Sequence, residues 1–217
     1  MLRGIDVLVF DVQDIGARFT PTSRPWASPC SAAAAAKIPF IVLDRPNPLG
    51  GDDVAGFVLE GSLRSFVGQY PIPIVHGLTV GEIARMIMGE GWLDGLQRLD
   101  LKIVKMENWQ RAMRWPETQL TWVPTSPNIP TFQSALLYPG IGLVGRPTSM
   151  KAEERPPPLP FSVPLGCRRR ALIERLNRAA LAGVRFEAAS YVPVSIAGVA
   201  KHPRFVGQRV SGVRGSS

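Results

Sequence analysis

Two short apolar runs, each closed by an aspartate, constrain the fold of this chain more than any other feature. Residues 5–12 (IDVLVFDV) are almost continuously apolar up to Asp11, and residues 38–43 (IPFIVL) are followed at once by Asp44. Such runs predict buried strands of a parallel sheet. The 25 residues between them suit a crossover helix, which predicts a right-handed βαβ unit of an open α/β sheet. Ligands of such sheets bind outside the carboxyl ends of the strands, where Asp11 and Asp44 lie.

The rest of the chain continues this α/β pattern. Residues 79–82 (TVGE) have the form of a capping box, and apolar residues then recur at helical spacing until Gly89 and Gly91, which predicts a helix. Four further elements are expected on periodicity: a strand over 101–106, a short helix over 107–115, an amphipathic helix over 171–182 and a strand over 184–192.

Composition excludes several classes of protein. The chain has 217 residues, two cysteines and two histidines, so it can bury a core but offers neither a disulfide framework nor zinc-ligand spacing. No apolar run reaches the ~18 residues of a membrane span, and residues 1–12 lack the features of a signal peptide. We therefore expect no structural metal and no membrane span, and the compartment stays unknown.

Two proline-rich segments break the pattern and carry much of the charge. Residues 20–31 and 144–170 hold nine of the 21 prolines, both cysteines and five of the eight net positive charges. Residues 20–31 stand where the crossover helix is expected, although proline costs ~3 kcal/mol in a helix interior. A net charge of +8 would suggest a nucleic-acid partner, but no basic helix or aromatic platform accompanies it, so we expect none. On composition alone, both segments are compatible with surface loops.

Five ordered motifs carry a resemblance to a known family. They are DVLVFDVQDIGARF, IVLDRPNPLGG, SFVGQYPIPIVHGLTVGE, WVPTSPNIPT and ALLYPGIGL, and together they cover most of residues 1–143. The chain resembles the NamZ-like exo-β-N-acetylmuramidases, long known only as a conserved domain of unknown function. The similarity resumes more weakly from Ala171 to about Arg214.

The resemblance implies a fold and an activity. It implies a partial Rossmann-like domain with a parallel sheet over 1–135, followed by part of a smaller α/β domain over 136–217, in which 144–170 is irregular. Family members remove terminal N-acetylmuramic acid (MurNAc) from peptidoglycan fragments, and are often exported or periplasmic. The implied partner is a MurNAc-containing muropeptide.

The chain departs from the family at both ends and in the two proline-rich segments. An upstream Pro-Glu-His-Gly motif, whose glutamate is the family's leading catalytic candidate, is absent, and so is the end of the second domain. With codons chosen freely and the frame shifted by one base, residues 20–30 and PTSMKAEER become YTYLTTMGLAM and TNVNEGRGT, which resemble the family at these points. We hypothesise a fragment from a frameshifted gene, which intact DNA reading through both segments would contradict. We expect impaired activity and self-association of this chain.

Carboxylates at the predicted strand ends are the catalytic candidates. Glycoside hydrolysis usually needs two carboxyl groups, and Asp11, Asp14 and Asp44 could supply them. Asp11 and Asp14 could instead cap loops. Gln13 and Arg18 are predicted to bind the sugar, with Arg18 suited to the lactyl carboxylate, although a surface ion pair is an alternative for Arg18.

Two further motifs supply predicted substrate-binding residues. In residues 44–48 (DRPNP) the prolines fix a turn that displays Arg45 and Asn47, unless the turn is only structural. His76 could contact a sugar oxygen or relay a proton, or could be a structural histidine. Asn128 is a candidate amide ligand for the sugar.

No dinucleotide fingerprint follows the first predicted strand, so we expect no cofactor. Most of the tryptophans are expected to pack in the core rather than stack on sugar rings. A non-catalytic sugar-binding or vestigial α/β protein remains the alternative to an enzyme.

Overall fold

The computed structural model describes residues 2–19, 27–65, 68–126, 129–143, 169–181, 185–186, 188–191 and 207–210. The chain divides into two compact units, residues 1–121 and 122–217. The predicted boundary at residue 135 remains a prediction. Most of the two proline-rich segments, residues 20–26 and 144–168, lies outside the described residues.

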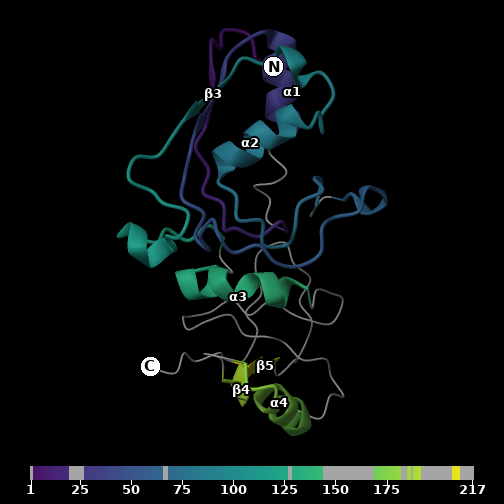
Figure 1. The fold of residues 1–217 in the computed structure, drawn as a ribbon, viewed down its shortest axis with the longest axis vertical. Coiled ribbons are helices and arrows are strands. Elements are labelled where there is room, and N and C mark those ends of the chain that lie inside the picture. Colours follow the sequence, from purple (N-terminus) through teal and green to yellow (C-terminus); the bar gives the residue numbers. More distant parts are fainter. Residues whose placement is uncertain are drawn as a thin grey trace. The chain divides into compact units, whose positions relative to one another are not determined.

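A three-stranded parallel sheet is the centre of the first unit (Figure 1). Its strands are β1 (Leu8–Phe10), β2 (Phe40–Leu43) and β3 (Leu101–Val104), in the order β1-β2-β3. Leu8 pairs with Phe40, and Phe40 in turn pairs with Leu101. The predicted α/β class and the parallel pairing of the first two strands are confirmed.

The crossover helix begins at Ala27, within the proline-rich segment 20–31, and extends beyond that segment to Ala36. Helix α1 (Ala27–Ala36) connects β1 to β2 and ends in a run of alanines, the best helix formers. Pro29 falls in its first turn, where the missing N–H has no intrahelical partner to lose. The expected conflict between proline and helix therefore does not arise at Pro29.

Helix α2 (Val80–Gly89) confirms the predicted capping box. The Thr79 hydroxyl accepts a hydrogen bond from the Glu82 amide at 3.2 Å, and the Glu82 carboxylate accepts one from the Thr79 amide at 2.9 Å. Both helices pack on the same face of the sheet, on a core that includes Phe10, Phe40 and Val42.

The opposite face of the sheet is partly exposed. The expectation that the strands are buried on both faces is therefore wrong. Side chains alternate across a strand, so β1 turns Phe10 into the core and Val9 away from it. Val9 is 55% exposed and Val104 of β3 is 53% exposed. The apolar run around Asp11 therefore forms a strand with one buried face.

The short helix predicted over 107–115 is wrong. Asn108 adopts a left-handed backbone conformation with φ of 62°, which interrupts a helix. The Arg111 carbonyl accepts a hydrogen bond from the Gly51 amide at 2.6 Å, so contacts with a distant loop override the local helical pattern. In the described part of the first unit, 3-10 turns occur instead at Gly61–Leu63, Leu96–Arg98 and Trp115–Thr118.

Among its described residues, the second unit contains two helices and a two-stranded antiparallel sheet. Its elements are α3 (Phe132–Gly142), α4 (Arg169–Arg178), β4 (Ala188–Tyr191) and β5 (Gly207–Val210). The helix predicted over 171–182 thus begins two residues earlier and ends four residues earlier, and Ala180 is left-handed with φ of 46°. The strand predicted over 184–192 is confirmed for residues 188–191.

Candidate active site

A pocket of about 630 Å³ opens at the carboxyl ends of the three parallel strands. Asp11 follows β1, Asp44 and Arg45 follow β2, and residues 106–109 follow β3. The remaining walls come from Leu43, Pro46, Met113 and residues 117–120. The structure thus brings Asp11, Asp44 and Arg45 together at the edge of the sheet where ligands of α/β proteins bind.

Asp11 and Arg45 form an ion pair across the two strand ends. The Arg45 Nε donates to Asp11 Oδ1 at 2.5 Å, and each side chain keeps roughly two fifths of its surface exposed. This hydrogen bond holds the pKa of the Asp11 carboxyl below its ordinary value, and it raises the pKa of the Arg45 guanidinium. The pocket therefore contains an ionised carboxylate that is accessible to a ligand.

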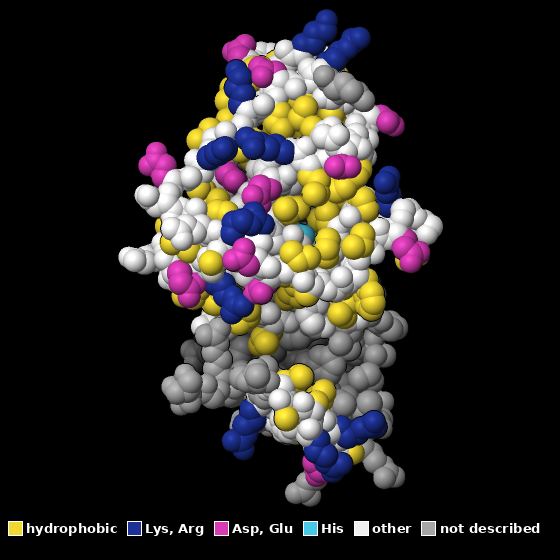
Figure 2. All heavy atoms as spheres, viewed as in Figure 1, with side chains coloured by type: hydrophobic (Ala, Val, Ile, Leu, Met, Phe, Trp, Pro, Cys, Tyr) yellow, Lys and Arg dark blue, Asp and Glu magenta, His cyan; other side chains and the backbone are white. Residues whose placement is uncertain are grey.

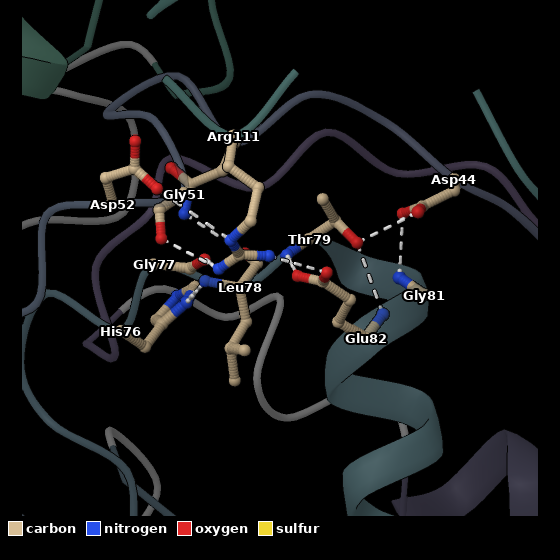
Figure 3. Close-up of polar contacts among 11 residues, drawn as sticks. Asp44, Gly51, Asp52, His76, Gly77, Leu78, Thr79, Gly81, Glu82 and Arg111 are labelled. Carbon is tan, nitrogen blue, oxygen red and sulfur yellow. Dashed lines mark hydrogen bonds and ion pairs between the residues drawn. The ribbon is translucent and has the colours of Figure 1, made fainter. Parts of the chain in front are cut away.

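The second carboxylate, Asp44, is engaged at the start of α2. Its Oδ2 accepts from the Thr79 hydroxyl at 2.8 Å, and its Oδ1 accepts from the Gly81 amide at 2.8 Å and from the Arg45 amide at 3.0 Å. Figure 3 shows the carboxylate facing Thr79 and Gly81. An anion is favoured at a helix N-terminus, so Asp44 fixes the end of β2 against α2 while it lines the pocket.

Arg111 connects this helix start to two loops, as Figure 3 shows. Its Nη1 donates to Glu82 Oε1 at 2.7 Å, while its Nη2 donates to the carbonyls of Gly51 and Gly77, each at 2.7 Å. The planar guanidinium suits such a branched set of acceptors. Sequence analysis missed Arg111 because its partners are 29 to 60 residues away in the chain.

Asp14 and His76 form a separate, buried pair. Both residues are 4% exposed, and His76 Nε2 lies 3.3 Å from Asp14 Oδ2, which also accepts from the Gly16 amide at 2.7 Å. The Leu78 amide donates to His76 Nδ1 at 3.1 Å, so Nδ1 is an acceptor and the ring proton lies on Nε2, toward Asp14. The geometry fixes the imidazole tautomer and its orientation.

Gln13 links the buried pair to the pocket. Its Nε2 donates to the carbonyls of Asp14 at 2.7 Å and of Pro46, a pocket-lining residue, at 2.8 Å. Its Oε1 is buried and has no hydrogen-bond partner among the described residues. Gln13 therefore connects the loop after β1 to the pocket wall, while its own carbonyl oxygen stays buried.

Two other predicted sugar ligands are buried in contacts with backbone groups. Arg18 is 7% exposed and its Nη1 donates to the carbonyls of Phe57 and Ile72, while burial lowers the pKa of its guanidinium. Asn47 is 1% exposed, accepts from the Leu49 amide at 2.9 Å and donates to the Leu78 carbonyl at 3.0 Å. Their predicted contacts with sugar remain predictions, and Asn128 lies outside the described residues.

The pocket also contains two glutamates that sequence analysis did not single out, and one of the tryptophans that it expected mostly in the core. Glu107 and Glu117 add two carboxyl groups, and Trp109 adds an aromatic surface. The indole Nε1 of Trp109 is buried without a hydrogen-bond partner among the described residues. Glu107 comes soon after β3, so its position after a predicted strand was the available signal, and the incorrect helix over 107–115 concealed it.

Charges of both signs are interspersed on the face drawn in Figure 2. No group of three or more His, Cys, Asp or Glu side chains that could hold a metal ion occurs in the described part of the chain. The helices within the described ranges are also too short or too polar to span a bilayer.

These features define an α/β protein with a parallel sheet and, at the carboxyl ends of its strands, a pocket that contains several charged side chains. Residues 1–133 match the family described as exo-β-N-acetylmuramidase NamZ, N-terminal, and the chain belongs to this family. The sequence resemblance to NamZ-like proteins is thereby confirmed.

Known proteins support the assignment in sequence and in structure. The peptidoglycan β-N-acetylmuramidase NamZ of Bacillus subtilis (strain 168) is 43% identical over 196 residues, which are 89% of this chain and 46% of the relative. A DUF1343 family protein from Bacteroides fragilis NCTC 9343 superposes with a TM-score of 0.82 at 38% identity, over 98% of this chain and 54% of that chain. A second DUF1343 protein from the same organism gives 0.69 at 30% identity, over 96% and 53%. The chain thus spans about half the length of the relatives it matches.

Proposed function

We propose that the chain acts on terminal β-linked MurNAc of peptidoglycan fragments, as an exo-β-N-acetylmuramidase. The observation that carries this proposal is the pocket at the strand ends, in which the ionised Asp11 stands among further carboxyl groups and beside Trp109. Carboxylates and an aromatic surface are the groups that a glycosidase needs to hydrolyse a glycosidic bond and hold the sugar ring. The Bacillus subtilis relative, a peptidoglycan β-N-acetylmuramidase, belongs to the same reaction class.

The pocket allows a division of roles between its carboxyl groups. Glycoside hydrolysis uses one carboxylate as nucleophile or base and one carboxylic acid to protonate the leaving oxygen. Asp11 suits the first role because Arg45 keeps it ionised and because it is accessible. Asp44, whose two oxygens already accept three hydrogen bonds, holds the pocket wall in place.

One of the remaining carboxyl groups is then the proton donor. Glu107 and Glu117 line the pocket and are exposed, whereas Asp14 is buried beside His76. We propose that Asp14 and His76 keep the loop that follows β1 in position behind the pocket. Gln13, which bonds to both Asp14 and Pro46, transmits that position to the pocket wall.

Hydrolysis of a chromogenic aryl β-N-acetylmuramide by the full chain tests the proposal. Asp11→Asn should lower kcat at least about 100-fold, because loss of a catalytic carboxylate removes an interaction made in the transition state. Asp100→Asn is the matched control, since Asp100 is also an exposed carboxylate paired with a cation, Lys102, at 3.5 Å. It should leave kcat unchanged within about twofold.

A binding titration with MurNAc beside this assay separates the enzyme from its alternative. Turnover that Asp11→Asn abolishes while affinity is kept supports the enzyme. Binding without any turnover supports a non-catalytic sugar-binding protein, an alternative that the engaged oxygens of Asp44 favour. Absence of both binding and turnover overturns the proposal.

A further inference from the structure

A second hollow of about 270 Å³ continues the pocket along the groove between α2 and β3. It shares Asp44, Met106 and Trp109 with the larger pocket, so the two hollows have common walls. Arg85 from α2 and Lys105, the first residue after β3, also line it. Two cations from separate elements thus converge next to the candidate site.

The side chains of these two cations lack the hydrogen-bond partners that the neighbouring carboxylates have. Asp44 accepts from Thr79 and Gly81, and Glu82 accepts from Thr79 and Arg111, as Figure 3 shows. The side chains of Arg85 and Lys105, in contrast, make no hydrogen bond or ion pair with any residue that the structure describes. The hollow therefore has donors available, while its acceptors are occupied.

A carboxylate is the ligand group that matches this surplus of donors. Arginine and lysine form charge-assisted hydrogen bonds with carboxylates, and these are stronger than hydrogen bonds between neutral groups. The sugar proposed for the larger pocket carries such a group on its lactyl ether, and in muropeptides the attached peptide carries others. A sugar ring beside Trp109 would bring either carboxylate toward the hollow.

We propose that Arg85 and Lys105 form a subsite for a carboxylate borne by the sugar, which selects muramic sugars over uncharged N-acetylhexosamines. This inference rests on the proposed function. It assigns a specificity-determining role to a pair that the family resemblance did not single out, and it does not involve Arg18.

The test compares three probes in binding titrations with the full chain. N-acetylglucosamine has no carboxylate, MurNAc has a free lactyl carboxylate, and N-acetylmuramyl-L-alanyl-D-isoglutamine has its lactyl carboxyl amidated and a carboxylate on the peptide. The double variant Arg85→Met, Lys105→Met removes both charges but keeps the apolar stems of the side chains. Arg98→Met is the matched control because Arg98 is exposed, belongs to the same unit and does not line either hollow.

We expect the double variant to weaken binding of MurNAc about tenfold or more, with binding of N-acetylglucosamine unchanged and Arg98→Met like the wild type. A loss confined to the muramyl dipeptide also supports the subsite and identifies the peptide as the source of the carboxylate. Equal losses for all three probes, or no loss for either acidic probe, overturn the subsite. In that case, MurNAc binding by the wild type would still support the proposed function. A wild type that neither binds nor hydrolyses MurNAc derivatives would contradict both the subsite and the proposed function.

Discussion

The carboxylate of Asp44 lies so close to Gly81 that no side chain fits between them. A Cβ at residue 81 would meet the Asp44 carboxyl carbon at 2.8 Å and Ile103 Cγ2 at 2.7 Å. The Gly81 amide donates to Asp44 at 2.8 Å. Close approach of α2 to the ends of β2 and β3 therefore requires glycine at this position, and it shapes the wall that both hollows share.

Gly81→Ala should destabilise the protein by about 1–3 kcal/mol, because the new methyl group forces the helix away from Asp44 and Ile103. Gly89→Ala is the matched control in the same helix, where a Cβ would meet nothing within 4 Å. It should stabilise the protein by up to about 1 kcal/mol through helix propensity. Urea unfolding measures both, and equal effects of the two substitutions would contradict the close approach.

Arg45→Gln should raise the pKa of Asp11 toward its ordinary value, because the hydrogen bond from Arg45 is the main cause of the lowered pKa. The lowered pKa in the folded state means that the pair stabilises the fold above the unfolded pKa of about 3.9, and that this contribution is lost as the pH falls through the folded value. Carbon-detected NMR titration of the Asp11 carboxyl gives the pKa in both proteins. An unchanged pKa in the variant would show that Arg45 does not control Asp11.

His76→Ala should cost about 2–4 kcal/mol of unfolding free energy, because it removes the imidazole that faces the buried Asp14 carboxylate and leaves the Leu78 amide without its acceptor. His76→Asn can restore an acceptor for Leu78 and should recover part of the loss. Chemical denaturation of the two variants measures the difference. If His76→Ala unfolds at the wild-type denaturant concentration, the buried pair does not hold the loop.

The Cys30 thiol should resist alkylation in the folded protein. Cys30 is 3% exposed, and burial raises its pKa to about 12, so little thiolate forms near neutral pH. The raised pKa stabilises the fold below the unfolded value of about 8.5, and the contribution is lost as the pH rises toward 12. Iodoacetamide labelling at pH 8 of a Cys167→Ser background, with and without urea, measures this protection. Rapid labelling without urea would contradict it.

Self-association should depend on the exposed face of the sheet. Val9 and Val104 are more than half exposed, and β1 is an edge strand of the described sheet. Apolar edges of this kind promote association between chains. Val9→Lys should therefore lower the apparent mass in light scattering, whereas Val54→Lys, at an equally exposed valine on a loop, is the control. A sharp, cooperative and monomeric melt of the wild type would contradict the expectation.

Local patterns predicted the elements that local contacts build. The capping box of α2 depends on residues three apart, and the parallel strands follow from apolar runs, so both were available from the sequence. The loop over 107–115 could not be predicted from the sequence, because Arg111 bonds to Gly51 and Gly77, which are distant in the chain.

The site was predictable to the same extent. The place of Asp11 and Asp44 at the strand ends follows from topology alone. Their different environments do not, because the partners of Asp44 come from α2 and the partner of Asp11 comes from the end of β2. The roles of Arg85, Lys105 and Trp109 depend on a groove between α2 and β3 that no local pattern encodes.

Mapping MurNAc binding onto backbone amides by NMR tests the central claim most directly. We expect concentration-dependent shifts at the ends of the three strands, around Asp11, Arg45 and Trp109, and shifts at the same places in the Asp11→Asn variant. Millimolar MurNAc that shifts only amides far from these strand ends, or none at all, would contradict the assignment of this pocket to the sugar.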